Sequence, residues 1–372
     1  MKSGSLRRWS FIHTWSSLIC TLFILISFLS GLPLLFRDQV DNFFCTNVPV
    51  QQVPPGTPLA SLDKVVANGL LQAPDQYVQF IIWDREGADV IVLGVGQGRD
   101  SPSERNKVLR LDAHTATFLD APDITKRISH LLLRLHSELF AGLVGTVLIG
   151  AMALLFVIAV VSGVVVYGPS MRKLDFGAMR RNRSSRILWL DMHNLTGAAL
   201  IVWTLVVGLT GFVNTWTDLA LKSWQKNQLR EIVELGAGDA ITPNPIPVQT
   251  AVDIALKVAP NMTPLFLAYP GSAFSTRSHY VVFLRGDTPL KSRLIQPVVI
   301  DAATGALAGT PAIPWYIKAL LLSQPLHFAD YGGLALRLVW ALLDVLTIGL
   351  LGTGLYLWVA RRKSAHKWRA KR

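Results

Sequence analysis

The sequence predicts an α-helical membrane protein, with four transmembrane helices and two small α+β domains outside the membrane. Three observations predict this class: an apolar composition, four long apolar stretches, and histidines and glycines that recur at fixed spacings. Of the 372 residues, 51% are hydrophobic and only 16% are charged. A soluble domain carries about a quarter charged residues, so the composition favours a chain that has lipid around it.

The apolar stretches cover residues 11–36, 143–167, 195–216 and 334–360. Each is long enough to cross a hydrocarbon core of about 30 Å as a helix. The first is too long for the apolar part of a signal peptide, and no small-residue cleavage site follows it, so we expect a membrane anchor. The predicted order is helix (1–36), domain (37–135), helix (136–168), basic loop (169–186), helix (187–216), domain (217–326), helix (327–360) and basic tail (361–372).

The net charge of +12 is unevenly distributed. Sixteen lysines and arginines lie before the first apolar stretch, between the second and third, and after the fourth, accompanied by one acid, Asp175. This is the pattern of cytoplasmic loops in membrane proteins. It predicts a bacterial inner-membrane protein with both termini in the cytoplasm and both domains in the periplasm. Because the cations follow the membrane topology, nucleic-acid binding is not expected.

The chain is an internal duplication. In both halves a histidine precedes a Ser-Gly or Thr-Gly pair by the same number of residues: 18 for His13–Gly31 and His193–Gly211, and 27 for His136–Gly163 and His327–Gly354. Outside the membrane, each half has an amphipathic helix, strand-like runs and an Asp-initiated turn, at Asp112 and Asp301. The predicted fold is therefore a helix–domain–helix unit that occurs twice.

Three segments resemble a known family: "LWLDMHNLTGA" (188–198), "VVIDAATGALAG" (298–309) and "PLHFADYGG" (325–333). With them the chain resembles the PepSY-associated transmembrane proteins over essentially its full length, and within that family the FoxB-type ferric-siderophore (ferrioxamine) reductases. The resemblance implies two periplasmic PepSY-like domains, bound haem and reduction of ferric siderophores of the hydroxamate type. The first copy departs from the pattern, with His114-Thr115-Ala116 where the second has Ala303-Thr304-Gly305.

Four of the eight histidines occupy duplicated positions. His13 corresponds to His193 near the cytoplasmic ends of two helices, and His136 corresponds to His327 near the outer ends. Two imidazoles on facing helices of a bundle can hold a planar iron macrocycle, so we predict two bis-histidine b-type haems, with these four residues as axial ligands of the iron. The alternative is that each is an interfacial or helix-end histidine. A zinc site would need three or four clustered ligands.

The remaining candidate residues are two arginines, an aspartate, the helix glycines, the other four histidines and a set of aromatic side chains. Arg134 and Arg337 are predicted to hold a haem propionate, and Arg337 and Asp344 are charged residues within the fourth helix. Glycines in the helices can serve close helix packing or leave room for a flat macrocycle. His130 is expected in a loop or on the surface, and His114, His279 and His366 are expected to be solvated. Tyr77, Trp83, Tyr280, Trp315 and Tyr316 are candidates for an aromatic wall around a ligand.

The predicted function is an oxidoreductase: a dihaem electron-transfer protein that reduces Fe(III)-siderophore to Fe(II) in the periplasm. Gly94, Gly96 and Gly98 lack the context of a dinucleotide fingerprint, so no NAD or FAD domain is expected. The electron donor would then be a quinol or a separate cytoplasmic reductase. Cys20 and Cys45 form no CxxC motif. The alternative function is a non-enzymatic PepSY membrane sensor or an assembly or regulatory protein, which would bind no haem.

Overall fold

The computed structural model describes residues 3–44, 48–83, 89–102, 106–171, 177–217, 219–224, 242–286, 288 and 291–369. The chain forms two compact units. The helical unit comprises residues 1–43, 128–217 and 323–372, and the sheet unit comprises residues 44–127 and 218–322.

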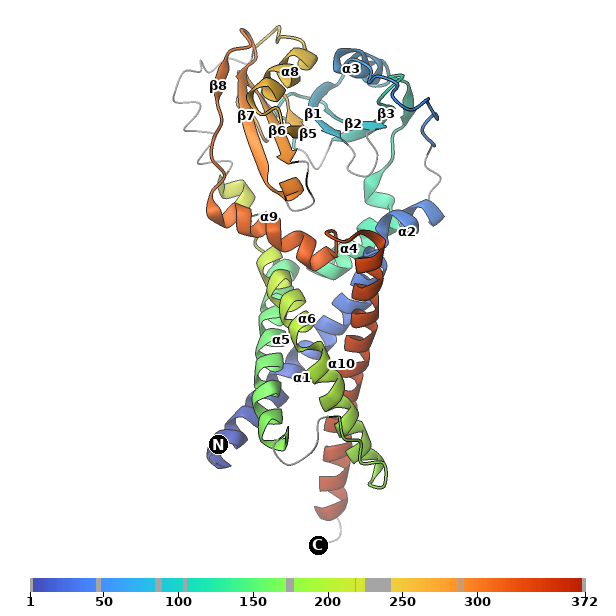
Figure 1. The fold of residues 1–372 in the computed structure, drawn as a ribbon, viewed down its shortest axis with the longest axis vertical. Helices are drawn as coiled ribbons and strands as arrows, with labels where there is room; N and C mark the ends of the chain where they lie inside the picture. The colour runs from blue at the N-terminus through green and yellow to red at the C-terminus, as the bar shows by residue number, and fades with distance from the viewer. Residues whose placement is uncertain are drawn as a thin grey trace. The chain divides into compact units, whose positions relative to one another are not determined.

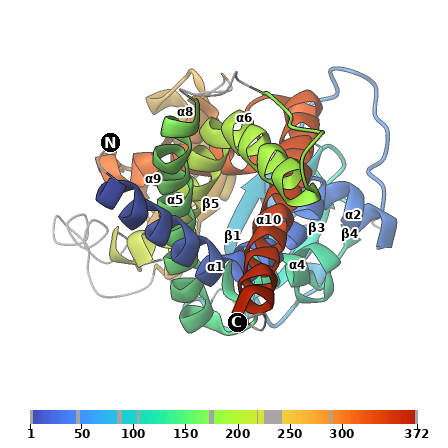
Figure 2. The same cartoon turned by 90° about the horizontal axis from the view of Figure 1, so that it is seen from below.

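Four long helices make up most of the helical unit (Figure 1): α1 (Ser3–Leu34), α5 (Gly142–Met171), α6 (Ser185–Asn214) and α10 (Gly333–Arg369). Each is long and apolar enough to cross a membrane. Helix α1 packs against α5 and α10, and α6 also packs against α5 and α10, so the four follow one another around a ring (Figure 2). The predicted bundle of four membrane-spanning helices is confirmed.

The second and fourth spans begin later than expected. His136 lies on a short helix, α4 (Ile128–Glu138), and His327 lies on α9 (Trp315–Phe328), and neither is part of the following span. Between α4 and α5 the chain turns through positive φ angles at Leu139, Phe140 and Gly142, and between α9 and α10 at Ala329 and Gly333. A residue in the left-handed backbone conformation ends a helix. Because such residues lie at both junctions, the helix is interrupted at the corresponding place in both copies.

The sheet unit contains one antiparallel sheet of eight strands in the order β4-β3-β2-β1-β5-β6-β7-β8. The strands are β1 (Tyr77–Trp83), β2 (Val90–Gly96), β3 (Lys107–Asp112), β4 (Phe118–Asp120), β5 (Met262–Ala268), β6 (His279–Gly286), β7 (Ile295–Asp301) and β8 (Leu307–Gly309). The two expected domains are thus the two halves of one sheet, joined where Ile81 of β1 pairs with Leu267 of β5. Pairing removes two exposed strand edges, which would otherwise leave backbone groups unsatisfied.

One helix from each copy covers the core of this unit. Helix α3 (Leu62–Leu71) packs on β1, β2 and β3, and α8 (Val248–Val258) packs on β5, β6 and β7. The two helices cap each other, since the Leu62 N–H donates to Gln249 Oε1 (3.0 Å) and the Val248 N–H donates to Asp63 Oδ1 (2.8 Å). These bonds satisfy first-turn donors that have no partner within their own helix.

The turn after β3 matches the turn after β7. Asp112 Oδ1 accepts the N–H groups of His114 and Thr115, as Asp301 Oδ1 accepts those of Ala303 and Thr304. Burial acts to raise the pKa of each carboxyl, but the bonds from these turn residues lower it, and the lowering prevails. Both turns then need a left-handed residue, which is Ala116 (φ 61°) in the first copy and Gly305 (φ 75°) in the second.

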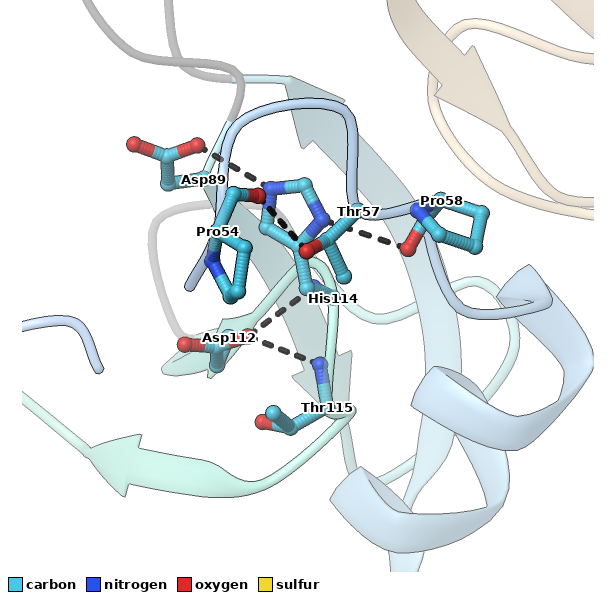
Figure 3. Close-up of polar contacts among 7 residues, drawn as sticks. All are labelled: Pro54, Thr57, Pro58, Asp89, Asp112, His114 and Thr115. Atoms are coloured by element: carbon cyan, nitrogen blue, oxygen red, sulfur yellow. Dashed lines mark hydrogen bonds and ion pairs between the residues drawn. The ribbon is translucent and has the colours of Figure 1, made fainter. Parts of the chain in front are cut away.

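His114 is bound in this turn rather than solvated (Figure 3). Its Nδ1 lies 3.2 Å from the Pro58 carbonyl oxygen and its Nε2 lies 3.2 Å from Asp89 Oδ1. Both nitrogens face acceptors, and only the doubly protonated ring can donate to both. The Pro58 carbonyl, and after it the Asp89 carboxylate, raise the pKa of His114. Asp112 is the other acid whose charge acts on the ring.

His279 is also not solvated. It is 5% exposed, and its Nδ1 lies 2.6 Å from Thr276 Oγ1. Burial lowers the pKa of this imidazole. The expectation of solvated histidines is therefore wrong for His114 and His279, while the side chain of His366 lies outside the described residues. Both residues lie at or next to a strand end, where the Pro58 carbonyl and the Asp89 carboxylate bind His114 and the Thr276 hydroxyl binds His279.

The raised pKa of His114 predicts a pH-dependent stability. The contribution is fully present below the unfolded pKa of about 6.5 and is lost as the pH rises through the higher folded value. We expect His114→Gln to lower the melting temperature of the full chain at pH 6 and to have less effect at pH 8.5. Thermal unfolding followed by intrinsic fluorescence measures this. Asp89→Asn should reduce the same difference, and an equal effect of His114→Gln at both pH values would contradict the prediction.

Candidate functional site

The four duplicated histidines form two pairs in the helical unit. His13 of α1 and His193 of α6, here called the first histidine pair, have ring centroids 6.5 Å apart. His136 of α4 and His327 of α9, the second histidine pair, have centroids 6.0 Å apart. Each pair joins residues that correspond in the duplication, so each combines one histidine from each half of the chain.

All four rings are anchored through Nδ1. The partners are the Ala159 carbonyl for His13 (2.9 Å), the Ser27 carbonyl for His136 (2.8 Å), Thr353 Oγ1 for His193 (2.9 Å) and Thr210 Oγ1 for His327 (3.1 Å). Both threonine hydroxyls already donate to helix carbonyls, Thr353 to Leu350 and Thr210 to Val206. They therefore accept from the imidazoles, and every Nδ1 is a donor.

This hydrogen bonding fixes the tautomer. A neutral imidazole that donates from Nδ1 has its free lone pair on Nε2, which is the nitrogen left to bind a metal. No group in the described part of the chain bonds to Nε2 of any of the four rings. Each pair thus offers two nitrogen ligands from half-buried side chains, one from each half of the chain.

Each ring lies against a glycine of a neighbouring helix. A Cβ added to the glycine would come within 3.0–3.3 Å of the imidazole Cε1 in four places: Gly163 on His13, Gly31 on His136, Gly354 on His193 and Gly211 on His327. Such distances are tighter than ordinary van der Waals contact, so an alanine would push the ring. The glycines that follow each histidine by 18 or 27 residues are therefore seats for the other histidine of the same half.

A cavity of about 460 Å³ lies at the first histidine pair. His13, His193, Gly163 and Gly354 line it, together with two arginines, Arg186 and Arg361. The volume falls within the range of pockets that hold small organic ligands. The cavity thus combines facing imidazoles, a wall without side chains at the glycines, and cations, in one place within the bundle.

The two arginines singled out in the sequence lie elsewhere in the helical unit. Arg134 Nε bonds to Glu138 Oε1 at 2.5 Å, and its guanidinium lies over the ring of Phe140. Arg337 Nη2 lies 3.8 Å from Asp330 Oδ1. Both arginines therefore have acidic neighbours, and neither lines the cavity at the first pair. Their predicted role at a propionate stays a prediction.

The aromatic wall expected around a ligand does not form. Tyr280 is 1% exposed in the core of the sheet unit, where its hydroxyl donates to the Ile246 carbonyl. Tyr77 and Trp83 lie at opposite ends of β1, and Trp315 is 80% exposed at the start of α9. The residues share a type but not a location, because they lie at two ends of β1, in β6 within the core, and at the start of α9.

Within the described residues, no group of three or more His, Cys, Asp or Glu side chains could hold a metal ion. Cys20 is a buried thiol of α1, and Cys45 lies outside the described residues. What the residues provide is therefore two pairs of nitrogen ligands. In the sequence, Thr353 and Thr210 indicate only the spacing of the Thr-Gly pairs, and their role as anchors of His193 and His327 was not predicted. The hydroxyl residue that precedes each recurring glycine is the feature that could have indicated this role.

Comparison with known proteins agrees with this architecture. An uncharacterized protein of Pseudomonas aeruginosa is 27% identical over 259 residues, which make up 63% of this chain and 64% of that protein. The chain thus spans less than two thirds of the length of this relative. The model of the PepSY-associated transmembrane region matches residues 10–361, which include most of each of the four long helices and both copies of the sheet. The chain belongs to the PepSY-associated transmembrane family.

Proposed function

We propose that this protein is a haem-dependent ferric-siderophore reductase of the bacterial inner membrane, similar to the FoxB-type enzymes. In this proposal two b-type haems bind, one between the two histidines of each pair. The protein then carries electrons across the membrane to reduce Fe(III)-siderophore in the periplasm. The observation that carries the proposal is that both pairs present facing imidazoles whose Nδ1 groups are anchored.

The spacing of the rings fits axial ligation. Metal–imidazole nitrogen bonds measure about 2 Å, and a ring nitrogen lies roughly 1 Å from the ring centre, so two imidazoles on one metal have centroids about 6 Å apart. The observed separations are 6.5 and 6.0 Å. The glycine seats and the cavity at the first pair support a flat ligand, and Arg186 and Arg361 provide cations for its acidic groups.

Bound between two imidazoles, a haem supplies a one-electron carrier without an open iron position. The chain's own residues hold each imidazole in one tautomer, exclude water with apolar helices and separate the two pairs. Along α1, the 18 residues from His13 to Gly31, the seat of His136, correspond to about 27 Å. The pairs therefore lie near opposite ends of the bundle, as a path across a membrane requires.

The direction of electron flow follows from the charge distribution. The basic termini and the basic loop favour a cytoplasmic location, which leaves the sheet unit in the periplasm. An electron would then enter at the first pair from a quinol or a cytoplasmic reductase and leave at the second. One electron converts Fe(III) to Fe(II), which the hard oxygen ligands of a hydroxamate siderophore bind more weakly, so that iron is released.

The visible spectrum of the purified chain tests this proposal. We expect about two b-type haems per chain in pyridine-haemochrome quantification, and the loss of one in His13→Ala and of the other in His327→Ala. Adding a ferric hydroxamate siderophore to the dithionite-reduced protein should reoxidise it. Substitution of His130, which is not paired with another histidine, should leave the haem content unchanged. A protein that stays colourless after haem supplementation would instead support the sensor or assembly role.

A second prediction concerns the glycine seats. In Gly163→Ala the added methyl group would lie 3.1 Å from His13 Cε1, and overpacking of this kind costs about 1–3 kcal/mol. We expect haem binding at the first pair to weaken roughly tenfold, as measured by haem titration of the apoprotein. Gly168→Ala is the matched control, since nothing lies within 4 Å of that position on the same helix. Equal affinities in the two variants would rule out a role for the seat.

A further inference from the structure

Asp344 is a carboxylic acid in the interior of the helical bundle. It lies in the fourth candidate membrane span, is 6% exposed, and its Oδ1 has no hydrogen-bond partner within the described residues. Thr347 and Leu351, which follow on the same face of α10 at helical spacing, are 0% and 9% exposed. The face that carries Asp344 is therefore directed into the bundle.

The position of Asp344 is between the levels of the two histidine pairs. It precedes Gly354, the seat of His193, by 10 residues, or about 15 Å along the helix. One turn before it lies Trp340, whose ring centroid is 6.5 Å from that of Trp203 on α6. Trp203 itself follows His193 by 10 residues and precedes Gly211, the seat of His327, by 8.

Two further polar atoms in this region are buried without a described partner. These are the indole nitrogens of Trp203 and Trp340, which can only donate hydrogen bonds. A buried donor or acceptor is costly unless it is satisfied, and buried waters usually bridge such groups. Two donors and a carboxyl oxygen in the middle of an apolar bundle indicate a polar site rather than simple packing.

Few other charges lie near this level. Residues 14–34 of α1 and 194–214 of α6 contain no Asp, Glu, Lys, Arg or His, and Cys20 is their only titratable side chain. In α5 the titratable side chain is Tyr167, and on α10 itself Arg337 and Tyr356 join Asp344 before Arg361. The nearest cation described on α10 is therefore Arg337, about two helical turns or 10 Å away and beside Asp330. Within the described residues no cation pairs directly with Asp344, and a buried carboxylate without a paired cation is strongly disfavoured.

We propose that Asp344 binds a proton when the protein is reduced and releases it when the protein is reoxidised. This inference rests on the proposed function, because the positive charge of oxidised iron held at the two pairs would favour an ionised carboxylate between them. When a reductant delivers an electron, the positive charge falls, and the Asp344 carboxylate takes one proton from water to become the neutral acid. Reoxidation by the ferric chelate removes the electron and returns the proton.

We expect reduction of the protein and proton uptake by Asp344 to be only partly coupled. At about 15 Å and an effective dielectric constant of about 20, one unit charge changes the proton affinity of a carboxylate roughly sixfold. By linkage, the equilibrium constant for reduction changes by the same factor between high and low pH. For a one-electron couple, at about 59 mV per tenfold, a sixfold change is about 45 mV.

Redox titration of the full chain in detergent, followed at its haem absorption bands between pH 5.5 and 9, tests this inference. In the wild type we expect the midpoint potential to fall by about 45 mV as the pH rises. Asp344→Asn should abolish this dependence, whereas Asp344→Glu should retain it. Asp38→Asn is the matched control, since it removes one acid from the partly exposed end of α2 (Arg37–Phe44) and should leave the dependence intact.

Infrared difference spectra of the reduced and oxidised forms give a second readout. A protonated-carboxyl band should appear on reduction in the wild type and be missing in Asp344→Asn. The haem content of the wild type and of the variant distinguishes a failure of this inference from a failure of the proposed function. This inference is wrong, and the reductase proposal stands, in either of two cases. Asp344→Asn binds two haems and keeps the wild-type pH dependence, or the wild type binds two haems but its midpoint potential does not depend on pH. If the wild type binds no haem, both are wrong.

Discussion

Burying an imidazole in an apolar helical bundle imposes two requirements on which the rest of the helical unit depends. The N–H of the ring needs an acceptor, and the ring itself needs space beside a neighbouring helix. Both are met at the same place, because each histidine bonds to a group within four residues of the glycine on which it lies. In each half the first helix seats the second histidine and the second span seats the first. The helices of a half are thus held in register from both ends.

The sheet unit follows the same reciprocal logic with different groups. Each copy leaves one strand edge and one helix N-terminus unsatisfied, and each is completed by the other copy, through the β1–β5 pairing and through Asp63 and Gln249. A half alone would expose backbone donors that the other half covers. The duplication is therefore more than a repeat in sequence, since in both units the two halves complete each other's polar groups.

The spacing of histidine and glycine was enough to predict which histidines correspond, and hence which rings face each other, because helical periodicity is local. The single sheet was not predictable in this way, since whether β1 pairs with β5 depends on contacts nearly 190 residues apart. The breaks before α5 and α10 were missed because Leu139, Phe140 and Ala329 are ordinary residues in unusual backbone conformations. Similarly, Tyr280 reads as a candidate binding residue until the sheet places it in the core.

The anchoring of the rings also bears on how two similar sites can differ. Each pair combines one histidine that donates to a backbone carbonyl, His13 or His136, with one that donates to a threonine hydroxyl, His193 or His327. The hydrogen bond at Nδ1 tunes the ligand strength of an imidazole, and this mixture is the same in both pairs. In the proposed function, a difference in potential between haems at the two pairs would therefore have to come from their surroundings. The arginines that line the cavity at the first pair, and the acids and arginines near the second, are the charges available to create it.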